Sequence, residues 1–193
     1  MEYSNPDTIG DMSTGGKLLN SLFQSVTFRT AGFASVPQQS LRQSTAAFGS
    51  LFMFIGGSPV GTAGGVKTVT FFVVLVNAMS FIRSRNETVI FGRRISGELI
   101  HKASAIIAVS FMITFVFMVL LMSVDGVDIT DAMYELFSAT ATVGLSRSLT
   151  PSLSVFGKLL VVVAMYLGRI GPISIALFFG AGGKQRNSFS YAR

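Results

Sequence analysis

Apolar residues gather in five stretches along the chain, and the lengths of these stretches predict different elements. Ala103 to Val124 contains 22 residues without a charge, which is long enough for a helix to cross a hydrocarbon core of about 30 Å. Gly16 to Phe28 and the segment after Asp128 are too short to span, so they favour helices that enter a membrane and turn back. Asp128 or Thr130 is suited to cap the second short helix, with Asp131 in its first turn.

The stretch from Leu41 to Ile82 is too long for one straight span. A continuous helix from Ala46 to Ile82 would measure about 55 Å at ~1.5 Å per residue, and its only charge would be Lys67. Its centre is rich in glycine, which predicts that the helix is interrupted there. Within a membrane, non-helical backbone is tolerated only where it is buried in protein or lines a cavity. We therefore expect a gate in an ion pathway, the alternative being a kink that only packs helices. The gate residues expected are Gly56, Gly57, Ser58, Pro59, Gly61, Thr62, Ala63, Gly64, Gly65 and Lys67.

The last apolar stretch, Leu153 to Gly183, carries Arg169 near its middle and a Gly171-Pro172 break. An unpaired charge at that depth costs about 2.5–3.5 kcal/mol on insertion scales, so such residues are functional candidates. We expect Arg169 to donate to carbonyls of the Gly56–Gly65 break and so latch the gate, or to pair with a carboxylate outside this chain. The alternative is a helix-packing role with the guanidinium in a polar cavity.

A short helix followed by a Thr-x-Gly turn and a long span occurs twice. The turns align on their glycines and supply rows of backbone carbonyls, which suit a dehydrated monovalent cation. Each turn taken alone is equally compatible with small residues that pack helices. The second copy follows a complete span and the first does not, so we expect a missing segment upstream. The predicted ion-binding residues are Thr30, Ala31, Gly32, Phe33, Thr142, Val143, Gly144 and Leu145.

The composition indicates an all-α integral membrane protein. Half of the 193 residues are hydrophobic, 12% are charged, and the mean hydropathy is +0.60. The net charge of +6 does not indicate nucleic acid, because the basic residues lie between apolar stretches rather than in a stripe with aromatic residues. The chain has no cysteine and one histidine, His101, and it shows no catalytic set, so we expect no enzyme.

Charges predict the topology. Basic residues crowd the loop after Ile82 and the C-terminal tail, which the positive-inside rule places in the cytoplasm, with the N-terminus outside. Acidic residues, Glu135 among them, are expected to form an acidic outer mouth that attracts cations. The expected divisions are an extracellular lead-in at 1–16, a short helix, turn and broken span at 17–82, a cytoplasmic loop at 83–102, a span, short helix, turn and span at 103–183, and a cytoplasmic tail at 184–193.

Three motifs in this order resemble the third filter, gate loop and fourth filter of the Trk/Ktr/HKT superfamily of potassium transporters, and most closely its bacterial Ktr-type branch. They are Phe23 to Phe33, Met53 to Thr68 and Thr140 to Ser146. The resemblance implies four M1-P-M2 pore-loop repeats around one pore, of which this chain carries one and a half. It also implies that Gly32 and Gly144 are filter glycines and that Arg169 is the basic residue of the fourth M2 helix.

The resemblance further implies K⁺ uptake, with Na⁺ as an alternative or coupled ion, K⁺ bound only at the filter, and no organic cofactor. The partners it implies are the missing N-terminal half, a second copy in a homodimer, a cytosolic nucleotide-binding regulatory ring and the lipid bilayer of the plasma membrane. The alternative function, from another class, is a non-conducting structural or regulatory membrane subunit or an inactive fragment.

Overall fold

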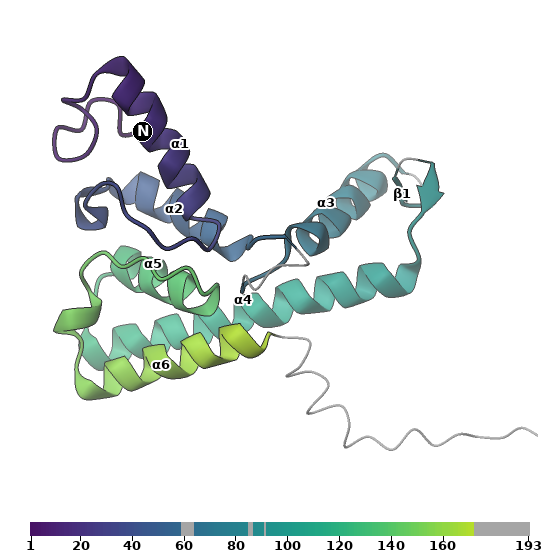
Figure 1. Cartoon of the computed structure of the whole chain (residues 1–193). Coiled ribbons are helices and arrows are strands. Elements are labelled where there is room, and N and C mark those ends of the chain that lie inside the picture. Colours follow the sequence, from purple (N-terminus) through teal and green to yellow (C-terminus); the bar gives the residue numbers. More distant parts are fainter. Residues whose placement is uncertain (59–63, 85–86, 91, 172–193) are drawn as a thin grey trace, which may run out of the picture.

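The computed structural model describes residues 1–58, 64–84, 87–90 and 92–171, and these residues are almost entirely helical (Figure 1). The all-helical prediction is therefore confirmed, apart from one two-stranded hairpin. The elements are α1 (Thr14–Thr27), the 3-10 helix η1 (Gln38–Ser40), α2 (Gln43–Phe54), α3 (Thr68–Ile82), β1 (Val89–Ile90), β2 (Arg93–Arg94), α4 (Gly97–Asp125), α5 (Ile129–Thr140), the 3-10 helix η2 (Thr150–Ser152) and α6 (Val155–Ile170).

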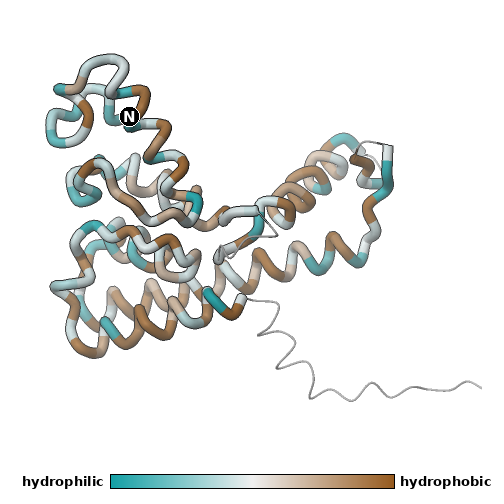
Figure 2. Tube along the Cα trace, viewed as in Figure 1, coloured by the Kyte–Doolittle hydropathy of each residue, from teal (hydrophilic) through white to brown (hydrophobic). Residues whose placement is uncertain are grey.

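Helix α4 is the longest helix among the described residues, and three other helices pack against it. Its 29 residues span about 44 Å at ~1.5 Å per residue, and α5 and α6 lie against one part of it while α3 lies against another (Figure 1). Within the described residues it is the one helix long and apolar enough to cross a membrane. Apolar residues extend along much of its length (Figure 2), and several of their side chains, including Phe111 and Met112, are half exposed or more. The helix predicted from Ala103 to Val124 is confirmed, with an N-terminal extension to Gly97.

Helix α5 is the most buried element and lies against α2, α4 and α6. Asp128 caps it by accepting a hydrogen bond from the Thr130 backbone N–H at 2.9 Å, and Asp131 lies in its first turn, as predicted. Tyr134 and Leu136 are fully buried in the two adjoining hydrophobic clusters of the core. A short helix thus sits inside the protein rather than on its surface.

The predicted break between two apolar helices is confirmed. Helix α2 ends at Phe54 and α3 begins at Thr68. The Gly56 N–H donates to the Val66 carbonyl at 2.8 Å, and the Val66 N–H donates to the Phe54 carbonyl at 3.1 Å. The chain therefore leaves the end of α2 and returns to the same point, which makes the break a loop with joined ends rather than a simple kink.

The elements that follow the two turns recur at a spacing of 112 residues. Helices α2 and α6 begin at 43 and 155, and η1 and η2 begin at 38 and 150. Arg42 and Ser154, which precede these helices, make equivalent bonds: each backbone N–H donates to an acidic side chain, Glu2 at 3.0 Å and Asp125 at 3.2 Å. The repeat differs in one respect, because α2 stops at Phe54 whereas α6 continues to Ile170.

Helix α1 confirms the short helix predicted from Gly16 to Phe28, but it is much less covered than α5. Leu18, Leu19 and Leu22 are each more than 60% exposed. The predicted span from Leu153 is helical from Val155 and ends at Gly171, whose φ is 81°. Its predicted continuation to 183 and the tail at 184–193 lie outside the described residues.

Candidate functional site

The two Thr-x-Gly turns have the same backbone conformation. Thr30 and Gly32 have φ of 71° and 78°, and Thr142 and Gly144 have φ of 57° and 88°. Glycine adopts this left-handed region freely, but a β-branched threonine does so at a cost of about 1–3 kcal/mol, which the surroundings must offset. Both turns follow the C-terminus of a short helix, so the predicted equivalence of the two turns extends to their backbone angles.

The two turns also meet. A Cβ atom at Gly32 would overlap the carbonyl oxygen of Val143, so only glycine allows the first turn to approach the second this closely. The Phe33 carbonyl accepts a hydrogen bond from the Thr27 hydroxyl at 2.5 Å, which ties the end of the first turn to α1. Gly32 and Val143, 111 positions apart in sequence, therefore lie close together.

The end of the break docks on the second turn. The Gly64 N–H donates to the Thr142 hydroxyl at 2.9 Å, and a Cβ at Gly64 would stand 2.5 Å from that oxygen. Of the predicted gate residues, the structure describes those up to Ser58 and from Gly64 onward, and it brings one end of the loop to the turn. The described gate residues are Gly56, Gly57, Ser58, Gly64, Gly65 and Lys67, whereas Pro59, Gly61, Thr62 and Ala63 lie outside the described residues.

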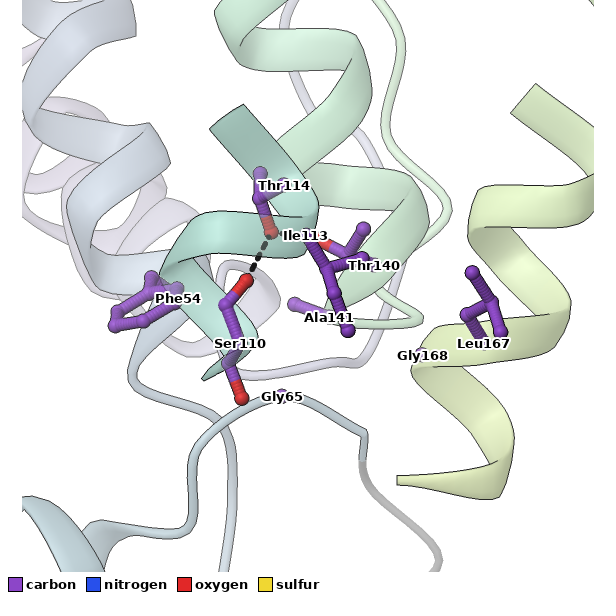
Figure 3. A pocket seen from close by; sticks show the side chains of 9 residues that line it. All are labelled: Phe54, Gly65, Ser110, Ile113, Thr114, Thr140, Ala141, Leu167 and Gly168. Carbon is purple, nitrogen blue, oxygen red and sulfur yellow. Dashed lines mark hydrogen bonds between the residues drawn. The ribbon is translucent and has the colours of Figure 1, made fainter. Parts of the chain in front are cut away.

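A small cavity of about 30 Å³ lies where the break meets the helices (Figure 3). Gly65 from the break, Ser110 and Thr114 from α4, and Thr140 from α5 line it. The Thr114 hydroxyl donates to the Ser110 carbonyl at 2.9 Å and lies 3.0 Å from the Thr140 hydroxyl. The loop end thus rests on a polar junction between α4 and the end of α5.

Arg169 also lies near the second turn. It lines a cavity of about 370 Å³ together with Glu135, Thr142, Gly144 and Met165. The structure therefore places Arg169 beside the second turn, in the last helical turn of α6. Its predicted donation to carbonyls of the break stays a prediction.

Glu135 was expected at an acidic outer mouth, but it is buried, with only 4% of its surface exposed. Its carboxylate accepts hydrogen bonds from Ser146, at 2.7 Å, and from Thr150. An acidic residue between apolar neighbours on a short helix, followed by hydroxyl residues after the turn, was the sequence signal for this contact. The position of Glu135 at an outer mouth stays a prediction, and the structure adds that its side chain turns into the protein.

The side chain of Gln38, a second polar group that sequence reasoning missed, connects the two copies of the repeat. Gln38, which is 5% exposed, receives hydrogen bonds on its side-chain oxygen from Gln24 and from the Tyr134 hydroxyl, each at 2.7 Å. Its side-chain nitrogen donates to the Val36 carbonyl at 2.7 Å. Helix α1, the loop after the first turn and α5 are thereby held together around a satisfied buried amide.

Glu2 ties the lead-in to the start of α2. Desolvation raises the pKa of Glu2, but hydrogen bonds from Thr45, Asn5, the Arg42 backbone and Thr8 together outweigh it and hold the pKa below its ordinary value of 4.5. The Glu2 carboxyl group therefore loses its proton more easily, and its negative charge lies at the N-terminus of α2. Within the described part of the chain, no group of three or more His, Cys, Asp or Glu side chains is arranged to hold a metal ion.

Residues 4–191 match the family model of TrkH, described as a cation transport protein. The chain is 42% identical over 179 residues to Ktr system potassium uptake protein B of Bacillus subtilis, covering 93% of this chain and 40% of that protein. It is 39% identical over 176 residues to the protein of the same name from Vibrio alginolyticus, covering 91% and 39% of the two chains.

A more distant relative is potassium/sodium uptake protein NtpJ of Enterococcus hirae, 32% identical over 163 residues, with 82% of this chain and 36% of the relative covered. The fold matches the crystal structure of the potassium transporter TrkH from Vibrio parahaemolyticus with a TM-score of 0.71. That match has 18% sequence identity and covers 89% of this chain and 39% of the other. The chain thus spans about two fifths of the length of the relatives it matches.

Proposed function

Because this chain belongs to the TrkH family of cation transport proteins, we propose that it forms part of a membrane pathway for potassium uptake. In this proposal the chain supplies two of four filter segments, Thr30–Phe33 and Thr142–Leu145, whose carbonyls bind dehydrated K⁺. The names of the Bacillus and Vibrio relatives support potassium as the ion, and that of the Enterococcus relative keeps sodium open as a second ion.

One observation carries the proposal: two turns with the same left-handed pattern lie face to face at the ends of two short helices. Rows of carbonyls replace the hydration shell of a monovalent cation only when several such strands converge. The 112-residue spacing of the elements around the turns supports a pore-loop repeat, with α5 as the pore helix between α4 and α6.

The loop between α2 and α3 is the proposed gate. Its ends are joined by the bonds between Gly56, Val66 and Phe54, and the bond from Gly64 to Thr142 holds its C-terminal end against the proposed filter. Arg169, which lines a cavity together with Thr142 and Gly144 of the second turn, is the proposed latch. K⁺ would leave the filter only when this loop moves away.

The environment and partners follow from the same proposal. The exposed apolar surface of α4 faces lipid, and the basic hairpin before α4 lies in the cytoplasm, opposite the Asp125 end of that helix. The remaining filter segments come from an N-terminal portion of the transporter. A homodimer on a cytosolic nucleotide-binding ring is the proposed assembly.

The test is a chimera in which this chain replaces the matching segment of the Bacillus subtilis relative, expressed in a host that lacks potassium uptake. We expect rubidium uptake and growth at low K⁺. Gly144→Ser, which forces a side chain into a backbone with φ of 88°, should lower the preference for K⁺ over Na⁺. A chimera that reaches the membrane without uptake would contradict the function, and unchanged selectivity in the variant would contradict the filter assignment.

A second candidate, a non-conducting structural or regulatory membrane subunit, is favoured by one observation: the chain spans about 40% of the Bacillus subtilis relative. In that case the chain would bind a complete transporter and alter its amount or activity.

A further inference from the structure

Glu135 is a buried carboxylate that the proposed pathway does not use. It lies on α5, is 4% exposed, and borders the cavity that Thr142 and Gly144 also line. Its Oε2 atom accepts a hydrogen bond from the Ser146 hydroxyl at 2.7 Å, and its Oε1 atom accepts one from the Thr150 hydroxyl. Both oxygens are therefore bound by the segment that directly follows the second turn.

Asp131, one helical turn earlier on α5, attaches the same segment a second time. Its carboxylate pairs with Arg147 at 3.1 Å, and the Arg147 side chain is only 11% exposed. Arg147 also donates to the carbonyls of Gln39 and Leu41, at 3.2 and 3.3 Å. Two carboxylates on one face of α5 thus hold residues 146–150, and the pair at Asp131 links them to the first copy.

The other end of the turn is attached to the same helix. The Val143 N–H donates to the Ser138 carbonyl at 2.9 Å, and the Thr142 N–H donates to the Ala139 carbonyl at 3.1 Å. The backbone from Val143 to Leu145 is thereby fixed to α5 at both ends. Without the later attachment, the left-handed residue Gly144 would leave this backbone free to adopt several conformations.

We propose that Glu135 is a positioning residue that, through Ser146 and Thr150, fixes the carbonyls of the second turn and so sets the selectivity for K⁺ over Na⁺. This inference rests on the proposed function. It concerns the second turn only, because no carboxylate among the described residues holds the first one: Ala34, 112 residues before Ser146, has no hydroxyl, and Gln38, 112 residues before Thr150, is bound by the Gln24 amide of α1 at 2.7 Å. The bond from Thr27 to Phe33 also ties the first turn to α1.

The test compares two replacements of Glu135 in the chimera with the Bacillus subtilis relative, with rubidium uptake measured against increasing Na⁺. Glu135→Leu removes both links, and we expect the preference for K⁺ to fall about tenfold, as for the loss of hydrogen bonds to a charged group. Glu135→Gln retains both links, because its oxygen accepts from one hydroxyl and its NH₂ group donates to the other, so selectivity should stay within about twofold. If Glu135 acted by its charge instead, the glutamine variant would also be impaired, because it has lost the charge, and it would lose uptake at low K⁺.

Ser146→Ala removes one link and should reduce selectivity less than Glu135→Leu. A variant that combines Ser146→Ala with Glu135→Leu should be no less selective than Glu135→Leu alone, because both changes remove the same contact. Ser152→Ala is the matched control, since the Ser152 hydroxyl donates to the Leu149 carbonyl at 2.7 Å and does not contact Glu135, and its selectivity should be unchanged.

Wild-type selectivity in Glu135→Leu, or equal losses in the leucine and glutamine variants, would overturn the positioning role. If Glu135→Leu does not reach the membrane, Ser146→Ala and Thr150→Val test the positioning role in its place. Unchanged selectivity in both of these variants overturns the positioning role. Failure of the unmodified chimera to take up rubidium is a different result, because it contradicts the proposed function rather than the role of Glu135.

Discussion

Thr142 combines a backbone that belongs to the predicted filter with a side chain that holds the proposed gate loop. Its φ is 57°, and its hydroxyl accepts the Gly64 N–H at 2.9 Å. The sequence motif accounts for the backbone of this residue, because the turn supplies carbonyls in a row. The side-chain contact adds a direct link between the predicted filter turn and the proposed gate loop.

Thr142→Val tests this link. Valine has nearly the same shape but accepts no hydrogen bond, so the closed loop loses a bond with a net value of about 0.5–1.5 kcal/mol. We expect rubidium uptake by the chimera to rise roughly 2- to 12-fold, at 1.4 kcal/mol per factor of ten, with K⁺ selectivity retained. Thr142→Ser keeps the hydroxyl and should behave as the unmodified protein. Equal uptake in the valine and serine variants would show that this bond does not hold the gate.

Glu2 predicts a dependence of stability on pH. Because its pKa in the folded protein lies below the ordinary value of 4.5, its carboxylate stabilises the fold above pH 4.5, and this contribution is lost as the pH falls through the lowered pKa. The melting temperature of the detergent-solubilised chimera should therefore drop below pH 4.5, and Glu2→Gln should remove part of that drop. Asp7→Asn, at an exposed acidic residue in the same segment, is the control. Identical pH curves for the unmodified protein and Glu2→Gln would contradict the assignment.

Among the elements, the loop between α2 and α3 is the one whose form the sequence left open. Glycine and proline predicted where the helix stops, but a kink and a loop have the same composition. The backbone hydrogen bonds between Gly56, Val66 and Phe54 show that the break is a loop whose two ends are joined, and not a kink. Because the loop closes on itself, it can be shortened without separating the two helices.

Deletion of residues 57–64 with a short connection between Gly56 and Gly65 should therefore leave α2 and α3 in place. If the loop closes the pathway, the deletion should raise potassium flux several-fold, because the bond to Thr142 and the bulk of the loop are both lost. The measurement is rubidium uptake per amount of protein in the membrane. A variant of normal abundance with unchanged flux would mean that the loop is a packing element and not a gate.

At the scale of the whole molecule, the two copies differ in how completely they are enclosed. Helix α5 is covered by three other helices, whereas the apolar side chains Leu18, Leu19 and Leu22 of α1 are largely exposed. The chain also spans about two fifths of its relatives' length. Both observations agree with a pathway completed by further transporter segments.

The chain expressed alone should therefore give no selective rubidium uptake in a potassium-deficient host. Co-expression with the remaining portion of the Bacillus subtilis relative should restore uptake if the chain supplies filter segments. A non-conducting subunit would instead change uptake only when a complete transporter is present. Selective uptake by the chain alone would contradict the requirement for four filter segments.

Local chemistry in the sequence determined the helical class, the two short helices with the cap at Asp128, the break and the two equivalent turns. These features depend on hydrophobic length, glycine and capping residues, which act within a few neighbours. The tertiary structure decided which distant groups meet: Gly64 with Thr142, 78 residues apart, and Tyr134 with Gln38, 96 residues apart. It also turned the Glu135 side chain into the protein. Side-chain direction depends on the partners that packing brings close, and no local pattern in the sequence specifies those partners.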